Sequence, residues 1–298
     1  MFIDIHAHAY RFPQRFVCKF CSAEQLIARW DELGIAKGVV MPIVSPEVYM
    51  PQTNEDILEM AEKYPDRIIP FCNIDPRMLL NSPKTDFGEM IEYYKSMGCK
   101  GIGEIMPKMD ILDPKMQNLL YYAEKAGMSV TFDGSPSRDL GFGVYDDPGL
   151  PQLEMTLMSF PDLVVFGHGP LFWSELAKLE TLGERGYFYT HKPGFVGMMG
   201  TGPIKEEGVV PKLFRKFPNL YGDLSDFTPI HMLRRDPEFG SKFLTEFQDR
   251  MFFGTDITSP SMEVTVIPLL NDWLAEGLIS QEVYDKISYK NAEKFLGL

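Results

Sequence analysis

The sequence has few cysteines. Its 298 residues include four, Cys18, Cys21, Cys72 and Cys99. Free thiols in a cytoplasmic protein are the simplest interpretation of this number and arrangement. Cys18 and Cys21 have the spacing of half a zinc site, but Cys72 and Cys99 form no second pair. Two thiols in a loop are the alternative interpretation of Cys18 and Cys21.

The sequence also lacks a long apolar run. No stretch reaches the roughly 18 apolar residues that a membrane-spanning helix needs. Residues 1–6 have no basic region, long apolar segment or small-residue cleavage site, so they do not resemble a signal peptide. We therefore expect a protein of the cytoplasm that does not insert into a membrane.

Positive charge is scarce as well. The chain has 29 Lys and Arg against 42 Asp and Glu, a formal net charge of −13. Such a surface repels nucleic-acid phosphates and anionic lipids, so we expect neither nucleic acid nor a membrane as partner. A small-molecule substrate is the expected partner, and the sequence leaves room for a homodimer. The content of 45% hydrophobic and 24% charged residues is typical of globular proteins.

The sequence is rich in short apolar runs that alternate with amphipathic, helix-like stretches. Eight runs read as strands: residues 2–5, 38–43, 67–75, 99–106, 128–132, 163–166, 220–224 and 251–254. The clearest helical stretches are residues 23–33, 54–63, 87–97, 115–126 and 213–217.

Continuous apolar strands that alternate with helices predict a parallel sheet covered on its outer face. Eight such units in 298 residues fit a closed (β/α)8 barrel, the TIM barrel, and an open doubly wound sheet is the alternative. No linker or low-complexity tract marks a boundary, so we expect a single domain over residues 1–298. The chemistry of such barrels lies at their carboxyl-terminal mouth.

Polar residues end four of the predicted strands. His6 and His8 follow the first strand two residues apart, and side chains at this spacing share one face. Glu104 ends the fourth strand, His168 the sixth and Asp256 the eighth. Burying such groups is costly unless they are paired or bound to a metal. For His168 taken alone, a hydrogen-bonded core histidine is the alternative.

Three motifs carry a resemblance to a known family. His6-Ala7-His8, Gly167-His168-Gly169 and Phe253-Gly254-Thr255-Asp256 resemble motifs of the amidohydrolase superfamily. The branch with aminocarboxymuconate-semialdehyde decarboxylase and related metal-dependent hydrolases is the most similar, and the resemblance covers the whole chain. It implies one divalent metal ion at the barrel mouth, usually zinc and sometimes manganese.

The resemblance also implies roles for individual residues. His6 and His8 would bind the metal, and Asp256 would bind it and carry a proton to or from its water. His168 would orient water or substrate. Glu104 stands where some members of the superfamily have a ligand carboxylate.

One position departs from the family pattern. The fifth predicted strand is followed by Asp133, where the family usually has histidine. Asp133 can bind a cation through oxygen, which moves the expectation from zinc towards manganese and weakens a two-metal interpretation. Three carboxylates, Glu104, Asp133 and Asp256, would overcompensate one dication, so we expect one of them outside the ligand set. The sequence ranks Glu104 and Asp133 equally.

Three cations near the predicted mouth are candidates for holding a carboxylated substrate. They are Arg11 after the first strand, Arg138 after the fifth and Lys192 in the long connection after the sixth. The alternative for each is a solvated loop charge.

Three functions follow from this interpretation. The first is a metal-dependent hydrolase that attacks a small, carboxylated metabolite with metal-activated water. The second is a metal-dependent decarboxylase of an unsaturated or aromatic acid. The third, motivated by Asp133, is a catalytically silent barrel that binds a ligand.

Overall fold

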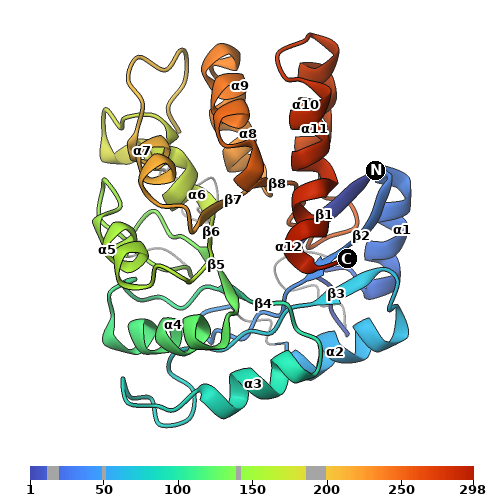
Figure 1. Cartoon of the computed structure of the whole chain (residues 1–298), viewed down its shortest axis with the longest axis vertical. Coiled ribbons are helices and arrows are strands. Elements are labelled where there is room, and N and C mark those ends of the chain that lie inside the picture. Colours follow the sequence, from blue (N-terminus) through green and yellow to red (C-terminus); the bar gives the residue numbers. More distant parts are fainter. Residues whose placement is uncertain (12–19, 49–51, 139–141, 186–198) are drawn as a thin grey trace, which may run out of the picture.

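Eight strands alternate with helices along the chain (Figure 1). The computed structural model describes residues 1–11, 20–48, 52–138, 142–185 and 199–298. The strands are β1 (Phe2–Ala7), β2 (Ile35–Val40), β3 (Ile68–Pro70), β4 (Gly101–Ile105), β5 (Ser129–Asp133), β6 (Val165–His168), β7 (Leu220–Asp223) and β8 (Met251–Phe252). Each strand overlaps one of the eight apolar runs, so this prediction is confirmed.

The strands close into a barrel. They pair in parallel in the orders β1-β2-β3 and β4-β5-β6-β7-β8. Parallel bridges between Cys72 and Ile102 and between Ala7 and Ile257 join the two sets at both seams. The predicted (β/α)8 barrel is therefore confirmed, and the open sheet is excluded.

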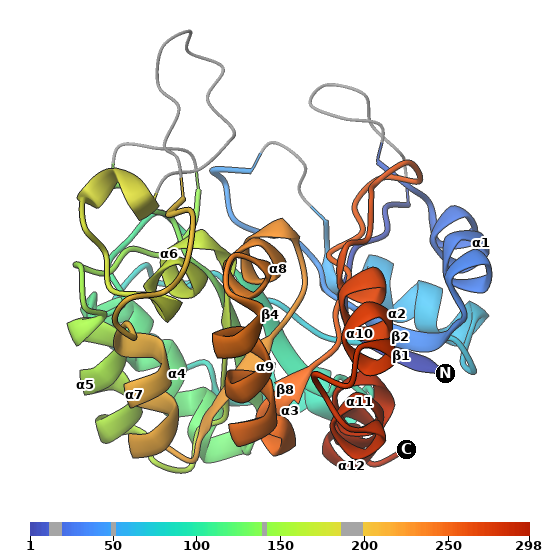
Figure 2. The same ribbon diagram turned by 90° about the horizontal axis from the view of Figure 1, so that it is seen from above.

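The helices surround this barrel (Figure 2). They are α1 (Ala23–Leu33), α2 (Asn54–Lys63), α3 (Gly88–Ser96), α4 (Pro114–Ala126), α5 (Pro151–Ser159), α6 (Gly169–Trp173), α7 (Val209–Lys216), α8 (Phe227–Arg234), α9 (Pro237–Glu246), α10 (Val266–Ala275), α11 (Gln281–Asp285) and α12 (Asn291–Leu296). The five predicted helical stretches correspond to α1, α2, α3, α4 and α7. In the described part of the chain, no helix is long and apolar enough to cross a bilayer.

Local sequence sets where helix α1 begins and ends. The Ser22 hydroxyl accepts a hydrogen bond from the backbone N–H of Gln25, and the Gln25 side chain accepts one from the Ser22 N–H. This reciprocal pair satisfies two N–H groups that the first helical turn leaves without partners. Gly34 ends the helix at φ 71°, a left-handed conformation that glycine adopts without strain.

Apolar strand residues fill part of the barrel interior. Ile3, Ile5, Val39 and other strand residues form a buried cluster there, together with helix α12. The ring of Phe295 from α12 packs edge-on against the rings of strand residues, among them Phe166. A second and larger apolar cluster packs the strands against the surrounding helices, and polar residues occupy the carboxyl ends of four strands.

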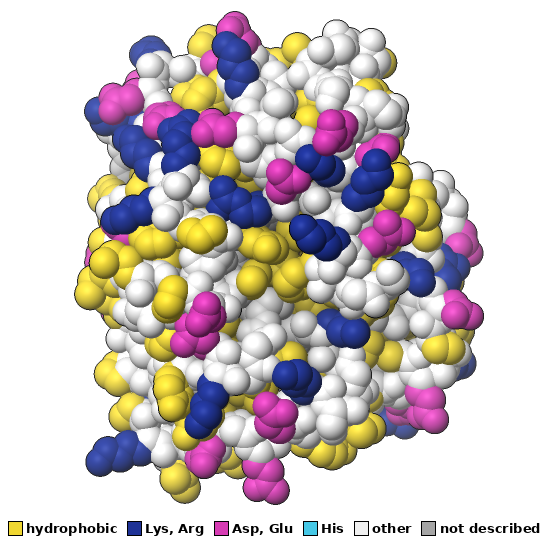
Figure 3. Space-filling model, in the orientation of Figure 1, with side chains coloured by type: hydrophobic (Ala, Val, Ile, Leu, Met, Phe, Trp, Pro, Cys, Tyr) yellow, Lys and Arg dark blue, Asp and Glu magenta, His cyan; other side chains and the backbone are white. Residues whose placement is uncertain are grey.

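The outer surface carries both signs of charge. Figure 3 shows Lys and Arg interspersed with Asp and Glu on one face, and no described histidine is visible there.

Among the cysteines, Cys21, Cys72 and Cys99 are buried free thiols. Cys18 lies outside the described residues, so the Cys18–Cys21 half-site stays a prediction.

Candidate metal centre

The two histidines of β1 reach the barrel interior because the strand has an extra residue. Ile3 and Ile5 pack inside the barrel, so strict alternation would turn His6 outward. However, Asp4 pairs with Gly38 and Ala7 with Val40, so three steps along β1 match two along β2. This β-bulge shifts the phase of the strand. Both imidazoles consequently point into the mouth.

Hydrogen bonds to Asp4 connect this bulge to neighbouring elements. Its carboxylate accepts hydrogen bonds from the backbone N–H of His6 (3.1 Å), the indole N–H of Trp30 (3.0 Å) and the hydroxyl of Thr255 (2.6 Å). Burial raises the pKa of Asp4 to about 7, although these hydrogen bonds oppose the rise. Asp4 therefore links β1 to α1 and to the segment after β8.

Four side chains from three places in the barrel converge at the mouth. The Nε2 atoms of His6 and His8 lie 3.1 Å apart. Glu104 Oε2 lies 3.5 Å from the first and 3.3 Å from the second, and Asp256 Oδ1 lies 3.6 and 3.2 Å from them. The four ligand atoms all lie within 4.8 Å of one another. Asp256 is the most open, with a side chain 20% exposed.

The hydrogen-bond partners of the two Nδ1 atoms indicate which kind of ion these four side chains can bind. His6 Nδ1 lies 2.6 Å from Asp223 Oδ2, and His8 Nδ1 lies 2.9 Å from the carbonyl oxygen of Met41. Both partners are acceptors, so each Nδ1 carries the proton and each neutral ring presents its Nε2 lone pair. Two lone pairs facing each other beside two carboxylates need a positive charge between them. The donor set therefore fits a divalent cation.

Without a metal ion, the pKa values of the two histidines in the folded protein also show that this place favours positive charge. Burial would lower the pKa of His8, but hydrogen bonds to Asp256 and Glu104 outweigh it and raise this pKa to about 9. Burial acts on His6 likewise, and the charges of Asp223 and Glu104 raise its pKa above the usual value. A metal ion would take the place of these protons.

Asp133 and His168 form a neighbouring group with Glu104. His168 Nε2 lies 3.4 Å from Glu104 Oε1, whereas the other oxygen, Oε2, lies near the two β1 histidines. Burial, together with the charges of Glu104, Asp256 and Asp226, raises the pKa of Asp133 well above its ordinary value. Of the two carboxylates that the sequence ranked equally, the geometry groups Glu104 with His6 and His8. The ligand assignments themselves stay predictions.

The sequence analysis missed a cluster at the end of β7. Asp223 and Ser225 are buried behind the histidines, and Asp226 is half-buried next to them in the sequence. Burial and the charge of Asp256 raise the pKa of Asp226. The signal was available, because the apolar run 220–224 contains a carboxylate near its end, as the fourth and eighth strands do.

Of the three predicted substrate-binding cations, the structure describes Arg11 and Arg138, and both pair with carboxylates outside the group of His6, His8, Glu104 and Asp256. Arg11 is half-exposed and pairs with Asp56 (3.5 Å) and Glu59 (3.4 Å) of α2. Arg138 pairs with Asp110 and stacks on the ring of Tyr145, with 4.0 Å from its guanidinium carbon to the ring centre. Lys192 lies outside the described residues. Their role in binding substrate stays a prediction.

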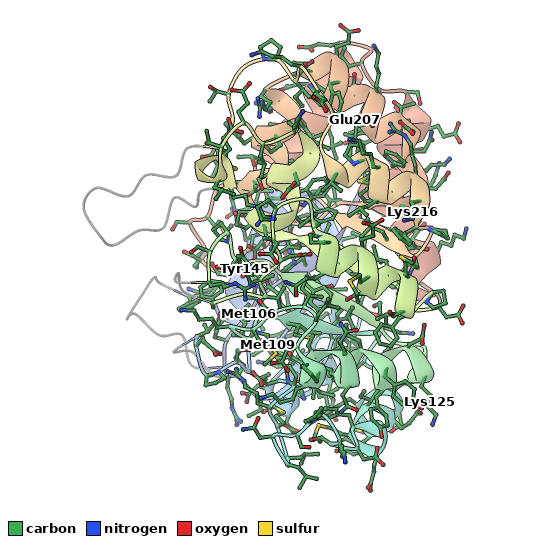
Figure 4. All side chains as sticks on the ribbon, turned by 90° about the vertical axis from the view of Figure 1, so that its left-hand side faces the viewer. Met106, Met109, Lys125, Tyr145, Glu207 and Lys216 are labelled. Atoms are coloured by element: carbon green, nitrogen blue, oxygen red, sulfur yellow. The ribbon has the colours of Figure 1, made fainter. Side chains whose placement is uncertain are left out.

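Arg138 joins two loops of the mouth. The N–H of Tyr145, in the loop after β5, donates to the carbonyl of Met109 in the loop after β4 (2.8 Å). Figure 4 shows Met106, Met109 and Tyr145 close together at this edge of the barrel. The described contacts of Arg138 thus stabilise the rim.

Comparisons with known proteins were made by sequence and by structure. No protein-family model matches this sequence, and no curated protein matches it significantly. A probable 2-pyrone-4,6-dicarboxylic acid hydrolase from Acinetobacter baumannii matches in structure with 16% identity and a TM-score of 0.62, covering 100% of this chain and 99% of that chain. An amidohydrolase from Burkholderia multivorans with bound zinc is 11% identical, with a TM-score of 0.62 and coverage of 100% and 99%.

A decarboxylase has the same architecture. The 2,6-dihydroxybenzoate decarboxylase from Rhizobium is 15% identical, with a TM-score of 0.56 and coverage of 99% of this chain and 98% of that chain. Hydrolases and a decarboxylase are the two kinds of enzyme that the motifs led us to expect. The likeness over whole chains shows that this protein has the barrel fold of these enzymes.

Proposed function

We propose that this protein is a metal-dependent hydrolase of the amidohydrolase type, acting in the cytoplasm on a small, carboxylated metabolite. One observation carries the proposal. The Nε2 atoms of His6 and His8 lie 3.1 Å apart beside Glu104 and Asp256, while Asp223 and Met41 hold the opposite ring nitrogens. This arrangement supports one divalent cation at the carboxyl ends of the strands, where barrel enzymes have their active sites.

Zinc is the metal that we propose, with manganese as the alternative. Two imidazole nitrogens favour zinc, and the carboxylate oxygens of Glu104 and Asp256 suit manganese as well. The structurally similar amidohydrolase with bound zinc supports the first choice. When bound, such a cation lowers the pKa of its bound water towards about 7 and polarises a carbonyl group.

The residues of the chain would then move protons and orient the reactants. Asp256 Oδ1 lies 3.2 Å from His8 Nε2, and its side chain is the most exposed of the four. A carboxylate at this place can accept a proton from the attacking water and return it to the leaving group. His168, 3.4 Å from Glu104, is placed to orient water or substrate. Arg11, Arg138 and Lys192 remain the candidates for the substrate carboxylate.

Decarboxylation is the second candidate, because 2,6-dihydroxybenzoate decarboxylase shares the fold over 98% of its own chain. In that reaction, the cation site would hold the substrate's carboxylate and a neighbouring oxygen. The groups that would hold the metal are the same, so the geometry of His6, His8, Glu104 and Asp256 supports both reactions. The reaction products distinguish hydrolysis from decarboxylation.

The test uses zinc- or manganese-loaded protein and two substrate panels. One panel has carboxylated lactones, esters and amides, and the other has unsaturated and aromatic carboxylic acids. Ring opening or acid release without carbon dioxide supports the hydrolase, and carbon dioxide release supports the decarboxylase. The His8→Ala variant serves as the control for metal dependence. Ligand binding without turnover, by protein that holds metal, would indicate the silent barrel.

A further inference from the structure

The carboxylate of Asp223 contacts the rear faces of two histidines. Asp223 Oδ2 lies 2.6 Å from His6 Nδ1 and 3.5 Å from His168 Nδ1. The hydroxyl of Ser225 lies 3.3 Å from the first of these nitrogens and 3.0 Å from the second. All four side chains are buried. One carboxylate and one hydroxyl thus face both rings from behind.

Asp223 is itself held on several sides. Its Oδ1 accepts a hydrogen bond from the backbone N–H of Ser225 (3.0 Å), and its carbonyl oxygen accepts one from the indole N–H of Trp173 (2.9 Å). Gly254 leaves room for the carboxylate, because a Cβ at that position would lie 2.6 Å from Oδ1. The direction of the carboxylate is therefore fixed by the chain around it.

This fixed carboxylate determines which nitrogen of His6 carries the proton. Both oxygens of Asp223 accept from an N–H group, one from His6 Nδ1 and one from Ser225. A carboxylate can only accept hydrogen bonds, so the His6 proton stays on Nδ1. The Nε2 lone pair then faces His8 and Glu104.

We propose that Asp223 is a positioning residue that fixes the tautomer and orientation of His6, with Ser225 extending the same network to His168. The proposal rests on the proposed function, since the tautomer matters only if His6 Nε2 binds a metal ion. Carboxylate partners of metal-binding histidines commonly change metal affinity in this way. Asp223 touches neither metal nor substrate in this account, and it acts through His6.

The experiment compares zinc affinities of the wild type and Asp223→Asn by competition with a chelator. Asparagine has the same shape but only one acceptor oxygen, so it cannot match both the His6 ring N–H and the Ser225 N–H. The His6 ring can give up this hydrogen bond more easily than the backbone N–H of Ser225, because its proton can move from Nδ1 to Nε2. We expect zinc affinity to fall by about 10–100-fold. Asp146→Asn is the matched control, because Asp146 is also fully buried and accepts its hydrogen bonds from the backbone of Gln152 and Leu153.

A second measurement does not depend on the variant folding. Nitrogen-15 NMR of zinc-loaded wild-type protein with labelled histidine should show a strongly deshielded proton on Nδ1 of His6, because the hydrogen bond to Asp223 is short. This proton should persist in Asp146→Asn and disappear or shift in Asp223→Asn.

Three results would be decisive. Unchanged zinc affinity in folded Asp223→Asn would overturn the positioning role and leave the metal centre intact. Absence of a proton on His6 Nδ1 in the wild type would overturn it as well. A wild-type protein that binds no metal would overturn the proposed function and this inference together.

Discussion

Asp4 accepts a hydrogen bond of 3.1 Å from the backbone N–H of His6, at the place where β1 has one residue more than its partner β2. The His-x-His spacing shows that two rings share a face, but it does not show which face. The bulge decides this, since Ile5 packs inside the barrel directly before His6. The buried carboxylate of Asp4 thus helps to hold the orientation of His6 towards the barrel mouth through the His6 backbone.

The first prediction concerns Asp256 as the residue that transfers a proton. Asp256→Asn keeps the shape and one oxygen but removes the basic group. We expect part of the metal to be retained while kcat falls roughly 10²–10⁴-fold, the usual loss for a general acid–base. Metal analysis and steady-state kinetics on the same preparation measure both effects. Activity within a few-fold of the wild type would rule out the proton-transfer role.

The second prediction separates Glu104 from Asp133. Glu104 Oε2 lies 3.3 Å from His8 Nε2, whereas Asp133 is grouped with Glu104 and His168. Glu104→Gln should therefore weaken zinc binding by more than about tenfold, because losing even a residue that only supports a ligand typically costs about 10–100-fold in affinity. Asp133→Asn is the matched variant and should bind zinc with nearly wild-type affinity. Equal losses in both variants, measured by chelator competition, would place both carboxylates on the metal.

The third prediction concerns pH and a carboxylate outside the site. Asp146 is buried before α5, where it accepts hydrogen bonds from Gln152 and Leu153. Burial raises its pKa from 3.8 to about 6, against the opposing effect of these bonds. The folded state therefore holds this proton more tightly than the unfolded chain. The stability that the group contributes is present below pH 3.8 and is lost as the pH rises through 6.

Urea denaturation of wild type and Asp146→Asn across this pH range tests the sign. The free energy of unfolding of the wild type, relative to the variant, should decrease as the pH rises. A difference that stays constant or grows with pH would show that the folded-state pKa of Asp146 is not raised.

The barrel could be predicted because its strands are short, apolar and separated by helical periodicity. Burial on both faces makes each strand a continuous hydrophobic run, which is visible without any long-range information. The polar ends of four strands could also be predicted, because a polar residue such as His8 or Glu104 stands out at the end of a hydrophobic run. The exact bounds were less accurate, as β8 covers only Met251–Phe252 of the predicted 251–254.

Other features could not be predicted because they depend on contacts between distant segments. The bond between Asp223 and His6 joins residues 217 positions apart, and no local pattern pairs them. Glu104 and Asp133 looked equivalent because each is a carboxylate at a strand end. Their different surroundings arise from where other strands of the barrel place His8 and His168. The pairing of Arg138 with Asp110 could not be predicted either, because the two residues belong to different loops.

The most direct test of the account is the metal content of purified wild type, His6→Ala and His8→Ala, measured by elemental analysis after incubation with zinc and removal of the excess. The apolar clusters that form the core do not include His6 or His8, so both variants should fold like the wild type, as circular dichroism can verify. We predict about one equivalent of zinc in the wild type and a small fraction of that in each folded variant. A full equivalent in either variant would contradict the proposed metal centre.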